Sequence, residues 1–259
     1  MKKRGLSLLL ALCMVLGTVT ALPEIASAAT NGILGDNITW TFDNGILTLT
    51  GNGEMITPIK STWYGDIVNF PWGSFGKNIK EVIVNEGITK ISDNAFYCFE
   101  NLTNVKLPQS LSFVDTAAFY RCENLEDIII PDGTKSVRGW AFAHCYKLKN
   151  ISLPQSIEYI DSGTFEECES LEKIVLPCKR ICISAFQKCT ALKEIVLYSD
   201  VTSISDYAFY DCTALTDVYY SGSEDDWKKI NIGTNNECLT NATIHYQYKP
   251  KDHSVDDYI

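Results

Sequence analysis

The chain has 259 residues, of which 46% are hydrophobic and 21% are charged. This composition excludes a disordered or collagen-like chain and allows one or two domains with a well-filled core. The 22 basic and 32 acidic side chains give a formal net charge of −10. Because such a surface repels a phosphate backbone, nucleic acid is not an expected partner.

Residues 1–28 have the features of a secretory signal peptide. A basic start at 2–4 precedes an apolar run over 6–19, which has the length of a signal core rather than of a bilayer span, and Ala-Ser-Ala at 26–28 is a small-x-small cleavage pattern. Cleavage there removes three basic and one acidic side chains and leaves 19 basic and 31 acidic, a net charge of −12. No later stretch reaches about 18 apolar residues. We therefore expect a secreted or cell-surface protein with no transmembrane segment in the mature chain.

Residues 29–78 are predicted to form an N-terminal β cap. The run 38–42 alternates around Trp40 and Phe42, the turn Asp-Asn-Gly at 43–45 contains residues that tolerate positive φ, and the following run alternates again. This pattern is typical of a β-hairpin.

From about residue 79 the sequence repeats a short unit. Each unit carries the mark Ala/Thr-Phe-x-x-Cys near its end, and the first copy is imperfect. The repeated phenylalanines, at intervals of 23, 23, 23, 21 and 23 residues, are Phe96, Phe119, Phe142, Phe165, Phe186 and Phe209. One period over six units predicts a repeat solenoid in which each unit forms one turn.

Each unit is predicted to contain a strand, a break and a returning segment. Apolar residues occupy positions one, four and six, as Leu102, Val105 and Leu107 do in the second unit, and positions four and six share one face of a strand. Proline, which cannot donate to a ladder, ends the strand in four units. Stacking at about 4.8 Å per turn then lines up equivalent residues in columns and forms a parallel sheet on the concave face. The second apolar position of each unit, also expected inside, is Ile91, Val114, Val137, Ile160, Ile181 or Ile204.

Residues 221–248 are predicted to form a C-terminal α/β cap beyond the solenoid, which spans 79–220. Ser223 and Asp226 stand three residues apart before an apolar position, a helix-start pattern of the capping-box type. A last strand is expected near 241–246. Residues 249–259 have little apolar content and are predicted to be a flexible tail.

The units over 79–220 resemble leucine-rich repeats of the BspA-like type, whose pattern is L-x-x-I-x-I-P-x-S-V-x-x-I-x-x-x-A-F-x-x-C. Ordinary leucine-rich repeats carry Asn or Cys nine residues into the unit. Here, as in BspA-like repeats, that slot holds Gly87, Ser110, Gly133, Ser156, Lys179 and Asp200. The flanks at 35–53 and 218–246 are similar to the strand pair and closing module of that family. The resemblance implies a bacterial cell-surface or extracellular protein, linked with adhesion, that binds an extracellular or cell-surface protein or glycoprotein.

Five cysteines occupy one slot of the repeat and are expected to be free thiols in the core. They are Cys122, Cys145, Cys168, Cys189 and Cys212. One rung apart, parallel side chains have Cβ atoms about 4.8 Å apart, beyond the usual spacing of a disulfide. Cys98 lies one residue out of this column, where Phe99 takes the expected place.

The fifth unit lacks two residues after its proline, and Cys178 is expected to replace the missing apolar residue. A Cys178–Cys182 disulfide stays open as an alternative. The mature chain has nine cysteines, so at least one thiol stays unpaired or pairs outside the chain. The sequence does not decide the redox state of Cys98, Cys178, Cys182 and Cys238.

The sequence indicates no catalytic, cofactor-binding or metal-binding group. His144 precedes Cys145, and such a pair can act as base and nucleophile, but other units have Arg, Glu, Lys and Asp in the histidine slot, which indicates an exposed, variable position. Cys178, Cys182 and Cys189 lack a fourth zinc ligand. No phosphate-binding glycine loop or nucleophile elbow is present. We expect no enzyme, cofactor or metal; an enzyme with an unfamiliar site is the alternative.

The variable strand positions are the candidates for binding a partner, because two columns are expected to point outward from the sheet. The first contains Glu81, Asn104, Asp127, Asn150, Lys173, Glu194 and Asp217. The second contains Ile83, Lys106, Ile129, Ser152, Val175, Val196 and Tyr219. An apolar column beside an acidic one would hold an extended or basic partner, although β-branched residues also favour strands for their own sake. We expect a non-enzymatic protein-binding module; a self-associating structural component of the cell envelope is the alternative.

Overall fold

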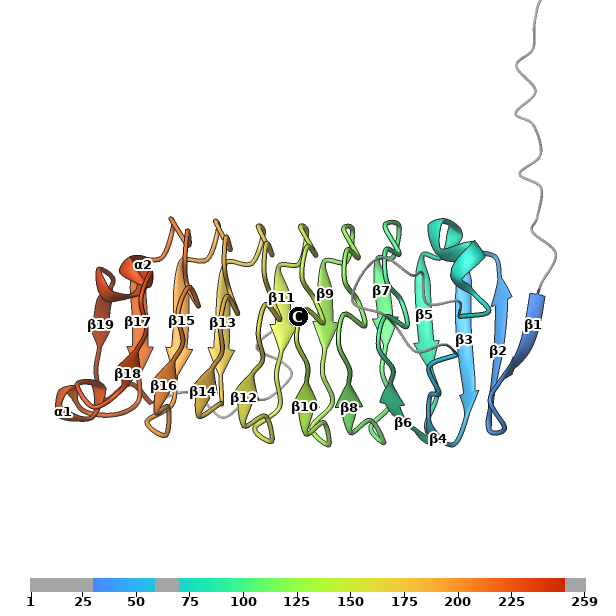
Figure 1. Ribbon diagram of the computed structural model, residues 1–259, viewed down its shortest axis with the longest axis horizontal. Coiled ribbons are helices and arrows are strands. Elements are labelled where there is room, and N and C mark those ends of the chain that lie inside the picture. The colour runs from blue at the N-terminus through green and yellow to red at the C-terminus, as the bar shows by residue number, and fades with distance from the viewer. Residues whose placement is uncertain (1–29, 59–69, 250–259) are drawn as a thin grey trace, which may run out of the picture.

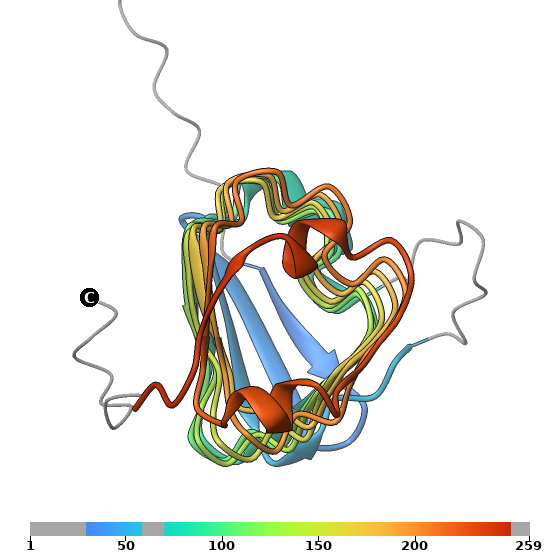
Figure 2. The same ribbon diagram turned by 90° about the vertical axis from the view of Figure 1, so that its left-hand side faces the viewer.

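The computed structural model describes residues 30–58 and 70–249. The predicted signal peptide and residues 250–259 of the predicted tail lie outside these ranges. Figure 1 shows successive turns of the chain stacked side by side along the long axis, and Figure 2 shows them superposed in one closed outline. The chain is therefore a solenoid, as its repeat predicts.

One side of the solenoid is a row of strands that we call the long sheet (Figure 1). From β3 onward its pairings are parallel, because each turn returns the chain in the same direction one rung further along. Its first hydrogen-bonded group contains β1 (Thr30–Leu34), β2 (Ile38–Asp43), β3 (Ile46–Gly51), β5 (Glu81–Val84) and β7 (Asn104–Lys106). The second contains β9 (Asp127–Ile129) and β11 (Asn150–Ser152). The third contains β13 (Lys173–Leu176), β15 (Glu194–Leu197), β17 (Asp217–Tyr220) and β19 (Thr243–His245).

A second row of short strands forms another side of each turn. One group contains β4 (Gly53–Glu54), β6 (Ile88–Ile91), β8 (Phe113–Val114) and β10 (Ser136–Val137). The other contains β12 (Tyr159–Ile160), β14 (Arg180–Ile181), β16 (Ser203–Ile204) and β18 (Asn231–Ile232). The second apolar positions of the repeat lie on these strands and are buried, which confirms their predicted inward direction.

The third side is the returning segment, which contains no regular strand but forms a backbone ladder. In one turn the amides of Ala117, Phe119 and Arg121 donate to carbonyls of the following turn at 2.8–3.0 Å. The residues two positions before and two positions after the phenylalanine are left-handed in this ladder, with φ of 54° at Ala117 and 56° at Arg121. The same two positions are left-handed in the other five turns, and only Gly163 among them is a glycine. Non-glycine residues there cost roughly 1–2 kcal/mol each, which the ladder offsets.

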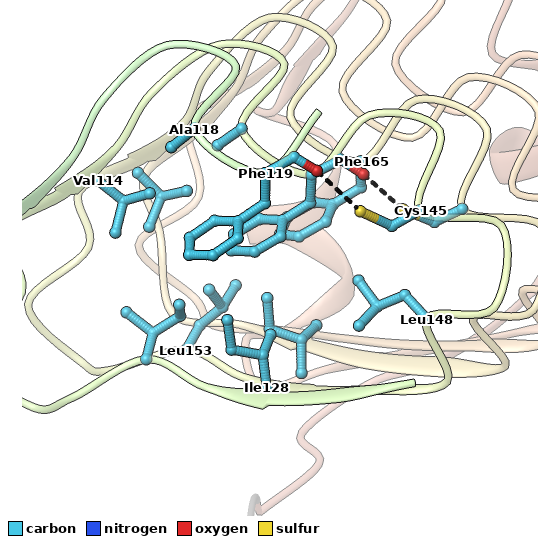
Figure 3. Close-up of a cluster of buried hydrophobic side chains, with 14 of the residues drawn as sticks. Val114, Ala118, Phe119, Ile128, Cys145, Leu148, Leu153 and Phe165 are labelled. Atoms are coloured by element: carbon cyan, nitrogen blue, oxygen red, sulfur yellow. Dashed lines mark hydrogen bonds between the residues drawn. The ribbon is translucent and has the colours of Figure 1, made fainter. Parts of the chain in front are cut away.

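The repeated phenylalanines form one continuous column in the core. All six are fully buried, and neighbouring rings lie with centroids 5.1–5.8 Å apart. Figure 3 shows the Phe119 ring above Ile128 and Leu153, which come from the long sheet side. The predicted stacking of equivalent positions is therefore the packing of the core.

The column cysteines have a defined role in this core. The Cys145 thiol donates to the Phe119 carbonyl oxygen at 3.2 Å (Figure 3), and the other four column thiols contact the corresponding carbonyl at 3.0–3.3 Å. Burial raises the pKa of Cys145 to about 12. All nine cysteines of the described chain are free thiols, so the alternative Cys178–Cys182 disulfide is not formed.

The shortened fifth unit keeps its register. Strand β14 still aligns Ile181 with Ile160 on one side and Ile204 on the other, so the two missing residues affect only the turn. Cys178 is fully buried and fills the apolar position, as expected. Across this short turn the Gln155 amide donates to the Tyr198 hydroxyl oxygen at 3.2 Å.

The ends of the solenoid differ in construction. At the N-terminal end β2 pairs antiparallel with β1 and β3, so the expected hairpin is present, and the 3-10 helix η1 (Gly73–Asn78) follows before β5. At the C-terminal end α1 (Glu224–Trp227) begins with the expected capping box, and α2 (Glu237–Thr240) precedes β19. Among the described residues no helix is long and apolar enough to span a membrane.

Candidate protein-binding face

The outward columns of the long sheet form the candidate site, which we call the outer face. Residues of β13 and β17 alternate between outward and buried positions, so Ile174 and Leu176 lie in the core while Lys173 and Val175 point away from it. The backbone register aligns equivalent residues of neighbouring turns. These aligned pairs include Glu81 with Asn104, Asp127 with Asn150, Lys173 with Glu194, Ile129 with Ser152, and Val175 with Val196.

Most of the predicted site residues are accessible, but Val196 is not. Ile129 is 42% exposed, whereas Val196 is only 2% exposed. The register places Val196 one rung from Val175 and one rung from Tyr219. At this spacing the side chains of these two neighbours enclose the short Val196 side chain. The prediction that Val196 is available to a partner was therefore wrong.

The first column does not present a free acidic surface. The Lys106 ammonium lies 2.7 Å from Glu81, and Lys173 lies 3.0 Å from Glu194. Asp127 is different, because it accepts a hydrogen bond from Asn150 and forms no ion pair within the described residues. The expected acidic column is thus largely neutralised by charges of the same face.

Two further ion pairs border the first column. Lys149 contacts Glu126 at 2.7 Å, and Lys193 contacts Glu172 at 2.8 Å. The hydrogen bond and charge of Lys149 lower the pKa of Glu126, so this carboxylate remains ionised at neutral pH. Sequence reasoning missed these pairs, although acid and base stand one repeat apart, at Glu126 with Lys149 and Glu172 with Lys193.

An aromatic group at the C-terminal end of the outer face was also missed. The Tyr219 ring stacks on His245 with centroids 4.7 Å apart and contacts Tyr248 at 5.0 Å. His245 Nε2 lies 2.7 Å from Asp217, and this hydrogen bond lowers the pKa of the carboxylate. Because His245 and Tyr248 belong to the cap, the repeat pattern carried no signal for their place in the columns.

The histidine and cysteine that are adjacent in sequence have separate environments. His144 Nδ1 lies 2.9 Å from Glu167, while the Cys145 thiol is buried against the Phe119 carbonyl. His144 is also more enclosed than expected, with 16% of its side chain exposed. The two side chains therefore do not form the base and nucleophile pair. In the part of the chain that the structure describes, no three His, Cys, Asp or Glu side chains are grouped as metal ligands.

Repeats of 21–23 residues, each with one parallel strand in the long sheet and one in the second row, define this chain as a leucine-rich repeat solenoid. The family model for the BspA type leucine rich repeat region matches six copies over residues 73–181 and 177–248. The chain belongs to this family, as its repeat pattern suggested.

One solved structure supports the fold, and two more distant ones are also similar. A leucine rich repeat protein of T. pallidum is 23% identical, with a TM-score of 0.55 over 73% of this chain and 78% of that chain. One from Bacteroides ovatus is 20% identical, with a TM-score of 0.49 over 82% and 70%. A leucine rich cell surface protein from Faecalibacterium prausnitzii is 17% identical, with a TM-score of 0.33 over 78% and 97%. No curated protein matches the chain.

Proposed function

We propose that this protein is a secreted or cell-surface module that binds an extracellular protein or glycoprotein along the outer face and so contributes to adhesion. Membership of the BspA type family supports a repeat module for protein interaction. The observation that carries the proposal is the exposed apolar side chain of Ile129 beside Asp127, an acid without an ion pair in the described chain.

The face suits an extended partner segment. Seven rungs at about 4.8 Å give a strip of roughly 30 Å, which matches about nine residues of extended chain. Ion pairs within the face leave little net charge to oppose a partner of either sign, so apolar contact at Ile129 and Val175 provides the attraction. The aromatic group at Tyr219 and His245 adds amphipathic contact area at one end of the strip.

The test begins with identification of a ligand that binds directly. The mature protein is offered to immobilised host extracellular proteins and to cell-envelope fractions, and each captured protein is purified and titrated by calorimetry. Ile129→Arg is expected to weaken that binding by about tenfold or more, as loss of a central apolar contact does. If the captured ligand is basic, the single substitution Asp127→Lys should also weaken its binding.

Ile183→Arg is the matched control, because Ile183 is 53% exposed but lies outside the long sheet. The control should bind as the wild type does. Equal affinity of the wild type, Ile129→Arg and Asp127→Lys would eliminate the outer face as the binding surface. Circular dichroism of each variant establishes that the solenoid is intact.

A further inference from the structure

The two ends of the long sheet offer different edges. At the C-terminal end β19 has only three residues, and the chain after it returns so that the amides of Gln247 and Tyr248 donate to Gly222 and Tyr220. At the N-terminal end β1 has five residues and pairs with β2 along one edge. Within residues 30–58 and 70–249 no strand pairs with its other edge.

Within the part of the chain that the structure describes, the unpaired edge of β1 lacks the features that keep sheet edges apart. Natural edge strands carry charges, prolines or bulges, or are covered by other segments. The β1 sequence is Thr-Asn-Gly-Ile-Leu, and its register with β2 is regular over all five residues. Ile33 is 68% exposed, the largest exposed fraction among the large hydrophobic residues described. An uncharged strand in a chain of net charge −10 is the place where two copies meet with least repulsion.

We propose that β1 pairs antiparallel with β1 of a second copy and joins the two long sheets into one. With Gly32 opposite its equivalent, all five residues are paired and Ile33 lies opposite Asn31 of the other copy. Both side chains then stand on the outward side, since Asn31 and Ile33 alternate with Leu34, which is buried. The contact is the same surface on both copies, so it closes with two-fold symmetry.

The difference between the two ends stops the assembly at two copies. The short edge of β19 offers no comparable strand, so the pairing produces a dimer and no filament. The two-fold axis is perpendicular to the sheet, and therefore both outer faces point to the same side. The dimer is thus bivalent, which raises avidity for a ligand that repeats at the right spacing.

The interface is smaller than the roughly 1,200–2,000 Å² of stable complexes, so the dimer is weak, with a Kd between about 10 µM and 1 mM.

Sedimentation equilibrium of the processed protein over this concentration range tests the proposal. The wild type should approach twice the monomer mass, while Ile33→Lys should remain monomeric, because the two lysines then lie diagonally across the axis on the same side of the sheet and repel each other. Asn31→Lys is the second variant, since it changes the same outward side without removing an apolar residue. Ile183→Lys is the matched control and should dimerise as the wild type does.

Hydrogen exchange locates the contact independently, because amides of residues 31–34 that gain a partner exchange more slowly at high concentration. A wild type that stays monomeric to 1 mM, or a dimer that survives both lysine substitutions in β1, overturns the proposal. Circular dichroism on each variant distinguishes lost pairing from lost folding.

Discussion

Replacement of Phe142 by alanine removes a ring from the middle of the core column. The side chain is fully buried, and its ring stacks on Phe119 at 5.3 Å and on Phe165 at 5.8 Å. A buried Phe→Ala substitution costs about 3–5 kcal/mol in lost burial and cavity formation. Each ring contact adds about 0.5–1.5 kcal/mol beyond burial. With two ring contacts we expect a loss of about 4–8 kcal/mol, which is large against the roughly 5–15 kcal/mol of a typical domain.

Phe209 supplies the matched comparison. It is equally buried, but among the described rings it stacks only on Phe186, at 5.2 Å. Phe209→Ala should therefore cost about 1 kcal/mol less. Phe209→Ala weakens one end of the ring stack. Phe142→Ala instead separates two groups of turns whose stability depends on their shared interface.

Urea denaturation followed by circular dichroism measures both changes. The central variant should show a lower midpoint and a broadened or two-step transition, because its two halves no longer unfold together. Equal free energies of unfolding for the two variants, or a central loss below about 2 kcal/mol, would refute the reasoning that ring stacking couples the turns.

Two other predictions concern pH and thiol chemistry. Hydrogen bonds from Lys229 and Ser223 lower the pKa of Asp226 to about 2 from 3.8. The ionised carboxylate therefore stabilises the fold above pH 4, and this stabilisation is lost as the pH falls towards 2. The melting temperature of the wild type should fall in this window, whereas Asp226→Asn should have a lower melting temperature at pH 5 and a flatter dependence on pH. A profile for Asp226→Asn identical to the wild type would contradict the assignment. Among the cysteines, Cys98, Cys182 and Cys238 are partly exposed and the other six are buried, so a thiol reagent at pH 8 should label three sites in the folded protein and nine in denaturant, as counted by mass spectrometry. Rapid labelling of a column cysteine in the folded protein would show that the core is open.

The sequence was sufficient to predict every property that depends on the period alone. Residues 23 apart, such as Phe119 and Phe142, share an environment because one turn of the solenoid returns the chain to the same place one rung along. The inward direction of Ile174 and the outward direction of Lys173 follow from strand alternation. For this reason the buried columns agreed with the structure.

Properties that depend on contacts between neighbouring rungs could not be predicted in the same way. Val196 looks like Val175 in sequence, yet its enclosure depends on the size of the adjacent Tyr219 side chain. The neutralised column depends on side-chain lengths, since Lys106 reaches diagonally to Glu81. The left-handed backbone at Ala117 and Arg121 has no glycine to reveal it. These features come from packing and ladder bonds, which composition does not encode locally.

The free thiols in the core affect how this chain folds under oxidising conditions. In an oxidising compartment an unfolded chain exposes thiols with their ordinary pKa, and these thiols readily form non-native disulfides. Once the turns have closed, burial raises the pKa of Cys145 and Cys178 to about 12, so reactive thiolate is scarce. On the secretion route proposed above, the turns must therefore close before the thiols oxidise, and a chain that folds slowly is expected to become cross-linked.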